Sequence, residues 1–431
     1  MPRQKNSCTP AYRRHRPSDR AVVTFDGSDF YLGPWNTKAS KLEYDRLVSE
    51  WLANGRCMPS ASSDRHAAPG DYMVMELARD YLRFAEQYYV KDDEQTSEVC
   101  CMRCALGYVA RLYGHTAASQ FGPLAIKAVR EAMIEAGLSR NTTNGYVARI
   151  KMAFKWAVSN ERVPANVYHG LTTVTGLRRG RSEARETEPV QPVPESMVDT
   201  ILPFLSSQAR AMVELMKITG MRAGEVTIMR ACDIDMTGPV WQYRPEVHKT
   251  MHYGKQRVIS LGPKAQEIIR PFLKLDLGAY LFSATDAVAE HRAEQRRNRK
   301  TKVQPSQRNR RKRNPKRKPG DHFTTDAIRR SIANACDAAY PLPEPLCKRE
   351  DETYTEWQAR LTDEQKAELA AWRKAHRFHP HQLRHLAATK LRKQFGIEAA
   401  RIILGHSTMA VTEVYAEIDQ AKASEIAEKT G

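Results

Sequence analysis

The stretch HPHQLRHLAATKL, residues 379–391, places histidines and an arginine at the start of a segment with the pattern of an amphipathic helix. His381 and Arg384 are three residues apart, so on a helix they share one face and can reach the same small target. A phosphate group suits such a pair. A His-x-x-Arg pair is also common as a solvated helix edge or a locally hydrogen-bonded pair, so the rest of the chain has to distinguish a site from a surface.

Length and composition limit the classes of protein to consider. The chain has 431 residues, of which 41% are hydrophobic and 27% charged, which predicts a globular protein of two or three domains. Because the sequence has no long apolar run and no apolar segment near its start, we predict a cytoplasmic protein without a membrane partner. The eight cysteines are thinly spread and predict free thiols. Cys101-x-x-Cys104 has no second pair at zinc-finger spacing, so we expect no metal.

The net charge of +18 indicates a polyanionic partner, most commonly nucleic acid. Residues 292–318 contain 14 Lys and Arg against one Glu, so this run alone carries +13 of the +18. The run is poor in apolar residues, and we predict that it is a mobile loop, within a basic insertion over about 286–321, that contacts phosphates through counterion release. A solvated spacer and a nuclear-import signal are the alternatives. The candidate DNA contacts in this run are Arg310, Arg311, Lys312 and Arg313.

Hydrophobic patterning predicts a mainly α-helical protein with small antiparallel β-sheets. Residues 1–66 predict a small module, in which β-rich runs within 21–33 flank a turn at Asp26-Gly27-Ser28 and a helix follows over 38–55. Charge and proline within 179–195 predict an interdomain linker. Residues 196–431 predict a second, α+β domain, with short strands at WQYRP (241–245), RVISLG (257–262) and YLFS (280–283) and helices near 196–220 and from 263, 323 and 363.

Residues 67–178 predict a compact helical domain. Its expected helices are 71–90, 97–114, 122–137 and 142–161. In the last one, Thr142 and Thr143 are expected to cap the start. The side chains expected in its core are Tyr146, Ile150, Met152, Phe154, Trp156 and Ala157. The basic side chains expected outside, as candidate DNA contacts, are Arg149, Lys151 and Lys155.

Further candidate residues lie in the second domain. Arg222 follows a helix-ending glycine, and Glu225, three residues on, can orient its guanidinium, although a surface salt bridge would have the same spacing. Lys249 is expected near the tip of a hairpin over 244–262. Gly405-His406 ends another helix, and Tyr415 follows on the next, where packing in a core is the alternative role.

Four boxes in this domain, TGMRAGE, HKT…GKQRVISLG, PHQLRHLAAT and LGHSTMAVTEVYAE, occur in an order and spacing that resemble the tyrosine recombinases, the phage integrase family. The resemblance implies an arm-type or accessory module at 1–66, a helical, SAM-like core-binding domain at 67–178 and a catalytic domain at 196–431. The catalytic residues that it implies are Arg222, Lys249, His381, Arg384, His406 and Tyr415.

The resemblance also implies a reaction, the site-specific cutting and rejoining of duplex DNA for integration or excision of a mobile element. Tyr415 would form a 3′-phosphotyrosine that preserves the bond energy, so no cofactor is needed. The two arginines would stabilise charge on the phosphate, and Lys249, or alternatively Lys255, would protonate the leaving 5′-oxygen. Glu225 would orient Arg222, and His385 would pack or hydrogen-bond locally.

The expected partner is double-stranded DNA carrying specific recombination sites, bound by four copies of the chain. Two alternatives stay open at this point. One is a catalytically silent architectural or regulatory DNA-binding protein of the same fold. The other is an enzyme that relaxes supercoils, like the type IB topoisomerases.

Overall fold

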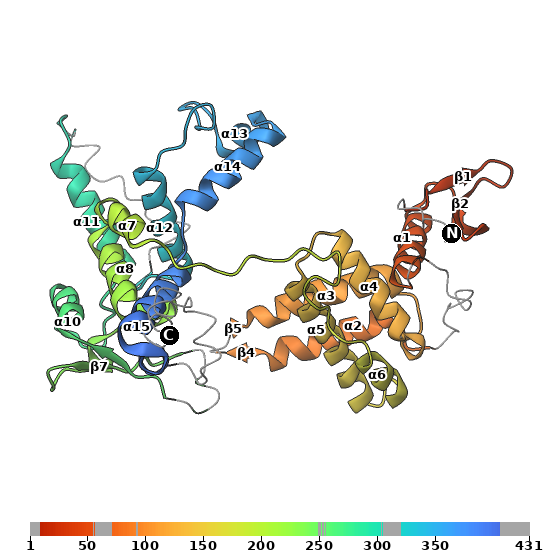
Figure 1. Ribbon diagram of the computed structural model, residues 1–431, viewed down its shortest axis with the longest axis horizontal. Coiled ribbons are helices and arrows are strands. Elements are labelled where there is room, and N and C mark those ends of the chain that lie inside the picture. The colour runs from red at the N-terminus through yellow and green to blue at the C-terminus, as the bar shows by residue number, and fades with distance from the viewer. Residues whose placement is uncertain are drawn as a thin grey trace, which may run out of the picture. The chain divides into compact units, whose positions relative to one another are not determined.

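The computed structural model describes residues 9–54, 56, 71–91, 94–248, 251, 254, 256–302, 304 and 320–405. The chain divides into two compact units, residues 1–188 and 189–431, and each has a hydrophobic core of its own. Helices dominate both units, and the sheets are small and antiparallel (Figure 1), as the sequence predicted.

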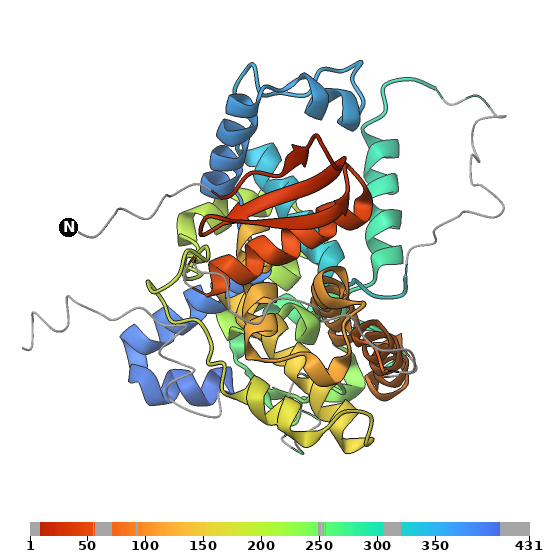
Figure 2. The same cartoon turned by 90° about the vertical axis from the view of Figure 1, so that its right-hand side faces the viewer.

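The first unit begins with a three-stranded sheet of β1 (Arg13–His15), β2 (Arg20–Phe25) and β3 (Ser28–Pro34), in that order. Asp26 and Gly27 both have positive φ, 50° and 84°, which suits the tight turn of a two-residue hairpin and matches the predicted turn. The following helix, α1 (Lys38–Ala53), lies along β2 and β3 (Figure 2). Strand β1 was not predicted.

The rest of the first unit is helical. Its helices are α2 (Val74–Tyr88), α3 (Ser97–Tyr113), α4 (Pro123–Glu135), α5 (Arg140–Ser159) and α6 (Ala165–Thr172), with β4 (Val90–Lys91), β5 (Glu94–Gln95) and the 3₁₀ turn η1 (Ala118–Gln120) between them. Helix α1 packs against α4, and the Tyr113 hydroxyl donates a 2.7 Å hydrogen bond to Glu50 of α1. The N-terminal module and the helical domain therefore form one compact unit.

Helix α5 corrects two predictions. Its cap is Ser139, whose Oγ accepts a hydrogen bond from the Thr142 amide, because the helix begins two residues earlier than its periodicity indicated. Thr143 lies in the core instead. Met152, predicted to be in the core, is 37% exposed, because α2 and α3 cover the opposite side of the helix.

The second unit combines helices with one small, three-stranded sheet. Its first elements are α7 (Glu195–Ile201), η2 (Leu202–Phe204), α8 (Ser207–Thr219), α9 (Ala223–Thr227), η3 (Ala231–Asp233), β6 (Ile234–Asp235), β7 (Trp241–Tyr243), β8 (Ile259–Leu261), α10 (Pro263–Ile269) and η5 (Arg270–Phe272). Strands β7 and β8 pair with Tyr243 opposite Ile259. The segment YLFS was wrongly predicted as a strand: Tyr280 makes a single bridge to Arg230, and β6 is the third strand.

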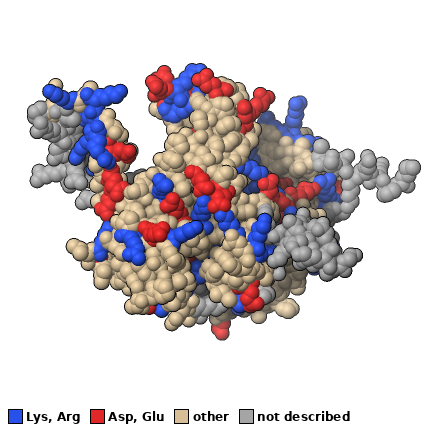
Figure 3. Space-filling view, turned by 60° about the vertical axis from the view of Figure 1, so that its left-hand side comes forward, with Lys and Arg blue, Asp and Glu red and all other residues tan. Residues whose placement is uncertain are grey.

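The later elements of this unit are α11 (Ala284–Arg297), α12 (Thr325–Ala339), α13 (Tyr354–Arg360), α14 (Asp363–His376) and α15 (Pro380–Leu404). Helix α11 contains the start of the basic insertion, so that part is an exposed helix and the prediction of a loop was wrong there. A Ser283 cap and a basic last turn stabilise it. On the face shown in Figure 3, Lys and Arg side chains are interspersed with Asp and Glu side chains over much of the surface.

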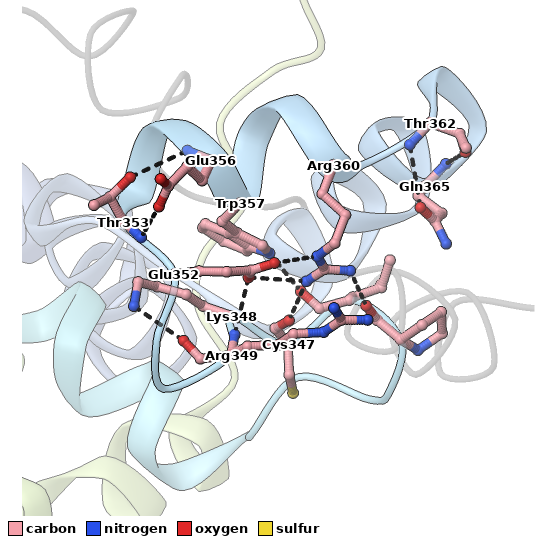
Figure 4. Close-up of polar contacts among 12 residues, drawn as sticks. Cys347, Lys348, Arg349, Glu352, Thr353, Glu356, Trp357, Arg360, Thr362 and Gln365 are labelled. Atoms are coloured by element: carbon pink, nitrogen blue, oxygen red, sulfur yellow. Dashed lines mark hydrogen bonds and ion pairs between the residues drawn. The ribbon is translucent and has the colours of Figure 1, made fainter.

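Helices α13 and α14 form a small insertion with an apolar cluster of its own. Thr353 with Glu356 and Thr362 with Gln365 form capping boxes that start the two helices (Figure 4). Arg360 donates to Glu352 and to the Cys347 carbonyl. Helix α13 was not predicted, although the T-x-x-E spacing of its capping box is visible in the sequence.

Candidate active site

The turn between α8 and α9 presents Arg222. Helix α8 ends at Gly220 in the left-handed conformation, with φ of 66°, and Arg222 is the residue that precedes α9. The Glu225 carboxylate accepts from the Arg222 amide at 2.8 Å and from its Nη1 at 2.7 Å. The predicted contact is therefore present, and it holds the guanidinium in one orientation.

Glu225 is almost completely buried. Burial alone would raise the pKa of Glu225, but the charge of Arg257 and the hydrogen bonds and charge of Arg222 lower it below its ordinary value. The carboxylate is thus ionised at neutral pH. Arg257 was not predicted as a site residue, although it lies in the quoted box GKQRVISLG.

Arg384 lies in the first half of α15 and is fully buried. Its Nη1 donates to the Gly220 carbonyl and its Nη2 to the Leu404 carbonyl, both at 2.7 Å. These carbonyls belong to the C-terminal ends of α8 and α15, where helices carry partial negative charge and lack internal donors. Arg384 therefore ties the turn that precedes Arg222 to the turn that precedes His406.

Arg222, His381 and Arg384 line one open pocket of about 440 Å³. Its wall consists of the turn 221–224, the start of α15 and, from α12, Thr325, Asp326 and Arg329. No role for α12 was predicted from the sequence. On a helix, the spacing of His381 and Arg384 was predicted to direct both toward one target, and both do line this pocket.

The histidines at the start of α15 differ in their surroundings. His381 has part of its surface accessible to solvent, yet desolvation, followed by the charges of His385, Arg384 and other neighbours, lowers its pKa to about 4. Burial likewise lowers the pKa of His379. His385 is buried, with its ring centroid 5.1 Å from that of His381 in an edge-to-face arrangement. His381 is therefore a neutral hydrogen-bonding group at neutral pH.

This pocket has the chemistry needed to hold a phosphate. A guanidinium fork binds two phosphate oxygens at once, and a second cation and a neutral imidazole add charge stabilisation and a hydrogen bond. The predicted residues Lys249, His406 and Tyr415 lie outside the described residues, as do Lys255 and the basic residues Arg310, Arg311, Lys312 and Arg313.

The three candidate DNA contacts on α5 have different surroundings. Arg149 forms an ion pair with Glu98 at 2.7 Å, and the Lys151 ammonium donates to the Val174 carbonyl. Both were predicted to face solvent and are partly buried, because α3 and the chain after α6 pack beside them. Lys155 is exposed as predicted.

Within the described ranges, no group of His, Cys, Asp or Glu residues has the arrangement to hold a metal ion. Cys101 and Cys104 are free thiols. No helix in the part of the chain that the structure describes is long and apolar enough to span a membrane.

Comparisons with known proteins agree with the motifs. Residues 193–336 match the model of the phage integrase family. No curated protein matches the sequence. Solved structures of similar fold include a lambda integrase tetramer bound to a Holliday junction, with a TM-score of 0.52 and 14% identity over 96% of this chain and 97% of that chain. A lambda integrase dimer bound to a COC′ core site has a TM-score of 0.50 and 15% identity, covering 96% of both chains.

A shorter lambda integrase, residues 75–356, as a dimer bound to a COC′ core site, has a TM-score of 0.51 and 14% identity, covering 80% of this chain and 95% of that chain. At these identities the likeness is one of fold. Residues 193–336 carry a phage integrase domain, and the chain shares the fold of the lambda integrases described above. Both findings support the tyrosine recombinase family that the four boxes resembled.

Proposed function

We propose that this protein is a site-specific tyrosine recombinase that cuts and rejoins duplex DNA through a 3′-phosphotyrosine intermediate, in the integration or excision of a mobile element. The observation that carries the proposal is the convergence of Arg222, His381 and Arg384 on one open pocket. The chain continues from α15 directly into the box that contains His406 and Tyr415.

In each step of the proposed reaction, one P–O bond forms as another breaks, so the number of phosphoester bonds stays constant. The Tyr415 phenol oxygen attacks the phosphorus of a phosphodiester and gives its proton to a histidine imidazole at the phosphate, His381 or His406. A P–O(Tyr) bond forms, and the bond from phosphorus to the 5′-oxygen breaks. Lys249 donates a proton to that leaving oxygen. Attack by the 5′-hydroxyl of another strand reverses these steps and releases the tyrosine, so no cofactor is needed.

The roles of the pocket residues follow from where charge develops. The transition state concentrates negative charge on the non-bridging phosphate oxygens, and we assign its stabilisation to Arg222 and Arg384 in the pocket lining. Arg329, which also lines the pocket, is paired with Asp326. His381 adds a hydrogen bond from a neutral ring, and His406 a further one. Glu225 orients Arg222, and His385 supports His381 by packing.

The proposed partner is double-stranded DNA with specific recombination sites, bound by four copies of the chain. A fold shared with the lambda integrase tetramer on a Holliday junction supports this assembly. The basic residues Arg310, Arg311, Lys312 and Arg313 are proposed to contact phosphates, together with Lys155 and, after release of their internal contacts, Arg149 and Lys151. Because DNA is the substrate, we place the activity in the cytoplasm.

Covalent trapping tests the proposal. Wild type, Tyr415→Phe and Tyr354→Phe are incubated with nicked or 5′-bridging-phosphorothiolate duplexes that cover the DNA flanking the gene, and SDS-resistant adducts are measured. Tyr354 is 62% exposed on α13 and serves as the matched control. We expect adducts with wild type and Tyr354→Phe and none with Tyr415→Phe, because only the nucleophile is removed.

Binding without adducts, on a site that the protein demonstrably recognises, would contradict catalysis and favour a silent architectural or regulatory DNA-binding protein. A plasmid-relaxation assay distinguishes the topoisomerase alternative. Relaxation of plasmids that lack any recombination site would contradict site-specific recombination, whereas recombination confined to plasmids with the site supports it.

A further inference from the structure

Arg257 lies just before β8, at the end of the segment that joins β7 to β8. Its side chain is 6% exposed. Its Nη1 donates to the Ile403 carbonyl at 3.2 Å, in the last turn of α15. Its Nε lies 3.6 Å from Oε1 of Glu225. One guanidinium thus contacts both the α9 turn and the end of α15.

The Glu225 carboxylate is shared between two arginines. Its Oε1 accepts from Nη1 of Arg222 and also faces Nε of Arg257. Arg222 lines the pocket, whereas Arg257 is absent from the pocket lining and contacts only the Glu225 carboxylate of this pair. Arg257 can therefore influence the pocket through Glu225 and Arg222, without contact to a bound phosphate.

The turn after α15 is built around the same guanidinium. Gly405 has φ of 66°, and a Cβ at this position would lie 2.3 Å from Nη1 of Arg257. Only glycine allows the chain to pass so close to the guanidinium. The position of Arg257 therefore limits the path of the backbone at Gly405.

Stability alone does not account for an arginine here. Within the described residues, Nε and Nη2 of Arg257 have no hydrogen-bond partner, and buried donors without partners lower stability. Well-packed apolar residues often replace buried ion pairs at no cost to stability. A requirement for position explains the arginine better.

We infer that Arg257 is a positioning residue for strand cleavage. It holds the Arg222–Glu225 pair and the turn at the end of α15 in a fixed position relative to each other. This inference rests on the proposed recombinase function. It assigns Arg257 no contact with DNA and no proton transfer.

Single-turnover trapping on the duplexes described above tests this role in the full-length chain. Arg257→Met removes the charge and keeps much of the volume, and Arg257→Lys keeps a charge near Glu225. Arg360→Met is the matched control, because Arg360 also bridges a carboxylate and a backbone carbonyl but lies in the α13–α14 insertion, outside the pocket lining (Figure 4). The adduct amplitude reports the folded fraction, and the rate constant at saturating DNA reports the positioning.

We expect Arg257→Met to lower the rate constant about 100-fold, as small misplacements of catalytic groups do, while DNA affinity and amplitude stay near wild type. Arg257→Lys is expected to recover part of the rate, and Arg360→Met to react at the wild-type rate. If Arg257→Met does not fold, the rate constant of Arg257→Lys tests the positioning role instead.

A wild-type rate constant in the Arg257 variants, or a decrease confined to amplitude, would overturn the positioning role while the proposed function stands. A wild type that forms no adduct on a site it recognises would overturn the proposed function and, with it, this inference.

Discussion

Arg384 serves two purposes in the second unit. Arg384 lines the pocket, and its guanidinium bonds the carbonyls of Gly220 and Leu404. A guanidinium has five N–H groups in a planar fork, so it can hold two helix ends and still face a phosphate, which a lysine ammonium cannot do in the same plane. The same residue therefore organises the two turns that carry the other proposed catalytic groups.

The pKa of His381 leads to a prediction on pH. Because folding lowers this pKa from 6.5 to about 4, the fold disfavours the protonated ring. The contribution of His381 to stability is present above pH 6.5 and is lost as the pH falls toward 4. A phosphate bound nearby should raise the pKa again, because negative charge favours the protonated ring.

NMR titration of the imidazole signals, with His381→Asn to assign the peak, measures this directly. We expect a midpoint well below the ordinary value in the free protein and a higher midpoint when duplex DNA is bound. A midpoint near 6.5 in the free protein would contradict the desolvation of His381.

At the scale of elements, the pocket depends on how α8 and α15 meet. Helix α8 ends at Gly220 directly against Leu404 and Ala387 of α15. Helix α15 is interrupted at Gly396, where φ is 84° and ψ is 173°, so its second half starts a new direction toward Leu404. The contact of these two helices decides the distance between the Arg222 turn and the end of α15.

Gly220→Ala tests this contact, and Gly137→Ala is the matched control. Both glycines have positive φ near a helix end, 66° and 78°, so both variants carry the same backbone penalty. A Cβ at Gly220 would lie 2.4 Å from Leu404 Cδ2, whereas one at Gly137 meets nothing within 4 Å. We expect Gly220→Ala to lower the free energy of unfolding by about 1–3 kcal/mol more than Gly137→Ala does, because of overpacking.

Denaturant unfolding measures the two decreases in the free energy of unfolding. The second unit is monitored for Gly220→Ala and the first unit for Gly137→Ala. Equal decreases would show that the helices move apart without cost, and the described packing of α8 on α15 would then not define the pocket.

At the scale of the whole molecule, charge is concentrated in one part of the sequence. The run 292–318 carries +13 of +18, and its described part is the exposed end of α11 and the residues that follow. On the face in Figure 3, charges of both signs are mixed over much of the remaining surface. Non-specific affinity for DNA is therefore expected to depend mainly on this run.

Replacing Arg310, Arg311, Lys312 and Arg313 together by alanine tests that expectation. We expect the slope of log affinity against log salt concentration to become shallower by about 0.9 for each DNA phosphate that the variant no longer neutralises, which is about 3.6 if all four residues contact phosphates. A variant with lysine at the three arginine positions keeps the charge and should keep the slope. DNA-binding titrations at several salt concentrations give the slopes, and an unchanged slope in the alanine variant would identify the run as a solvated spacer.

Sequence alone was sufficient for features that depend on neighbours a few residues apart. The hairpin turn at Asp26-Gly27, the glycine ends of α8 and α15, the Arg222–Glu225 pair and the shared direction of His381 and Arg384 all follow from local conformation and i, i+3 spacing. The four boxes indicated the family for the same reason, because their residues and order are properties of the chain itself.

Only the tertiary structure decided which distant groups these residues meet. Arg384 bonds a carbonyl 164 residues away and Arg257 one 146 residues away, and Arg149 is neutralised by Glu98 across 51 residues. Local spacing carries no information about such contacts, because they are set by how helices pack around a common core. For that reason the sequence indicated the proposed chemistry, whereas the role of Arg257 and the burial of Arg384 became visible only in the folded chain.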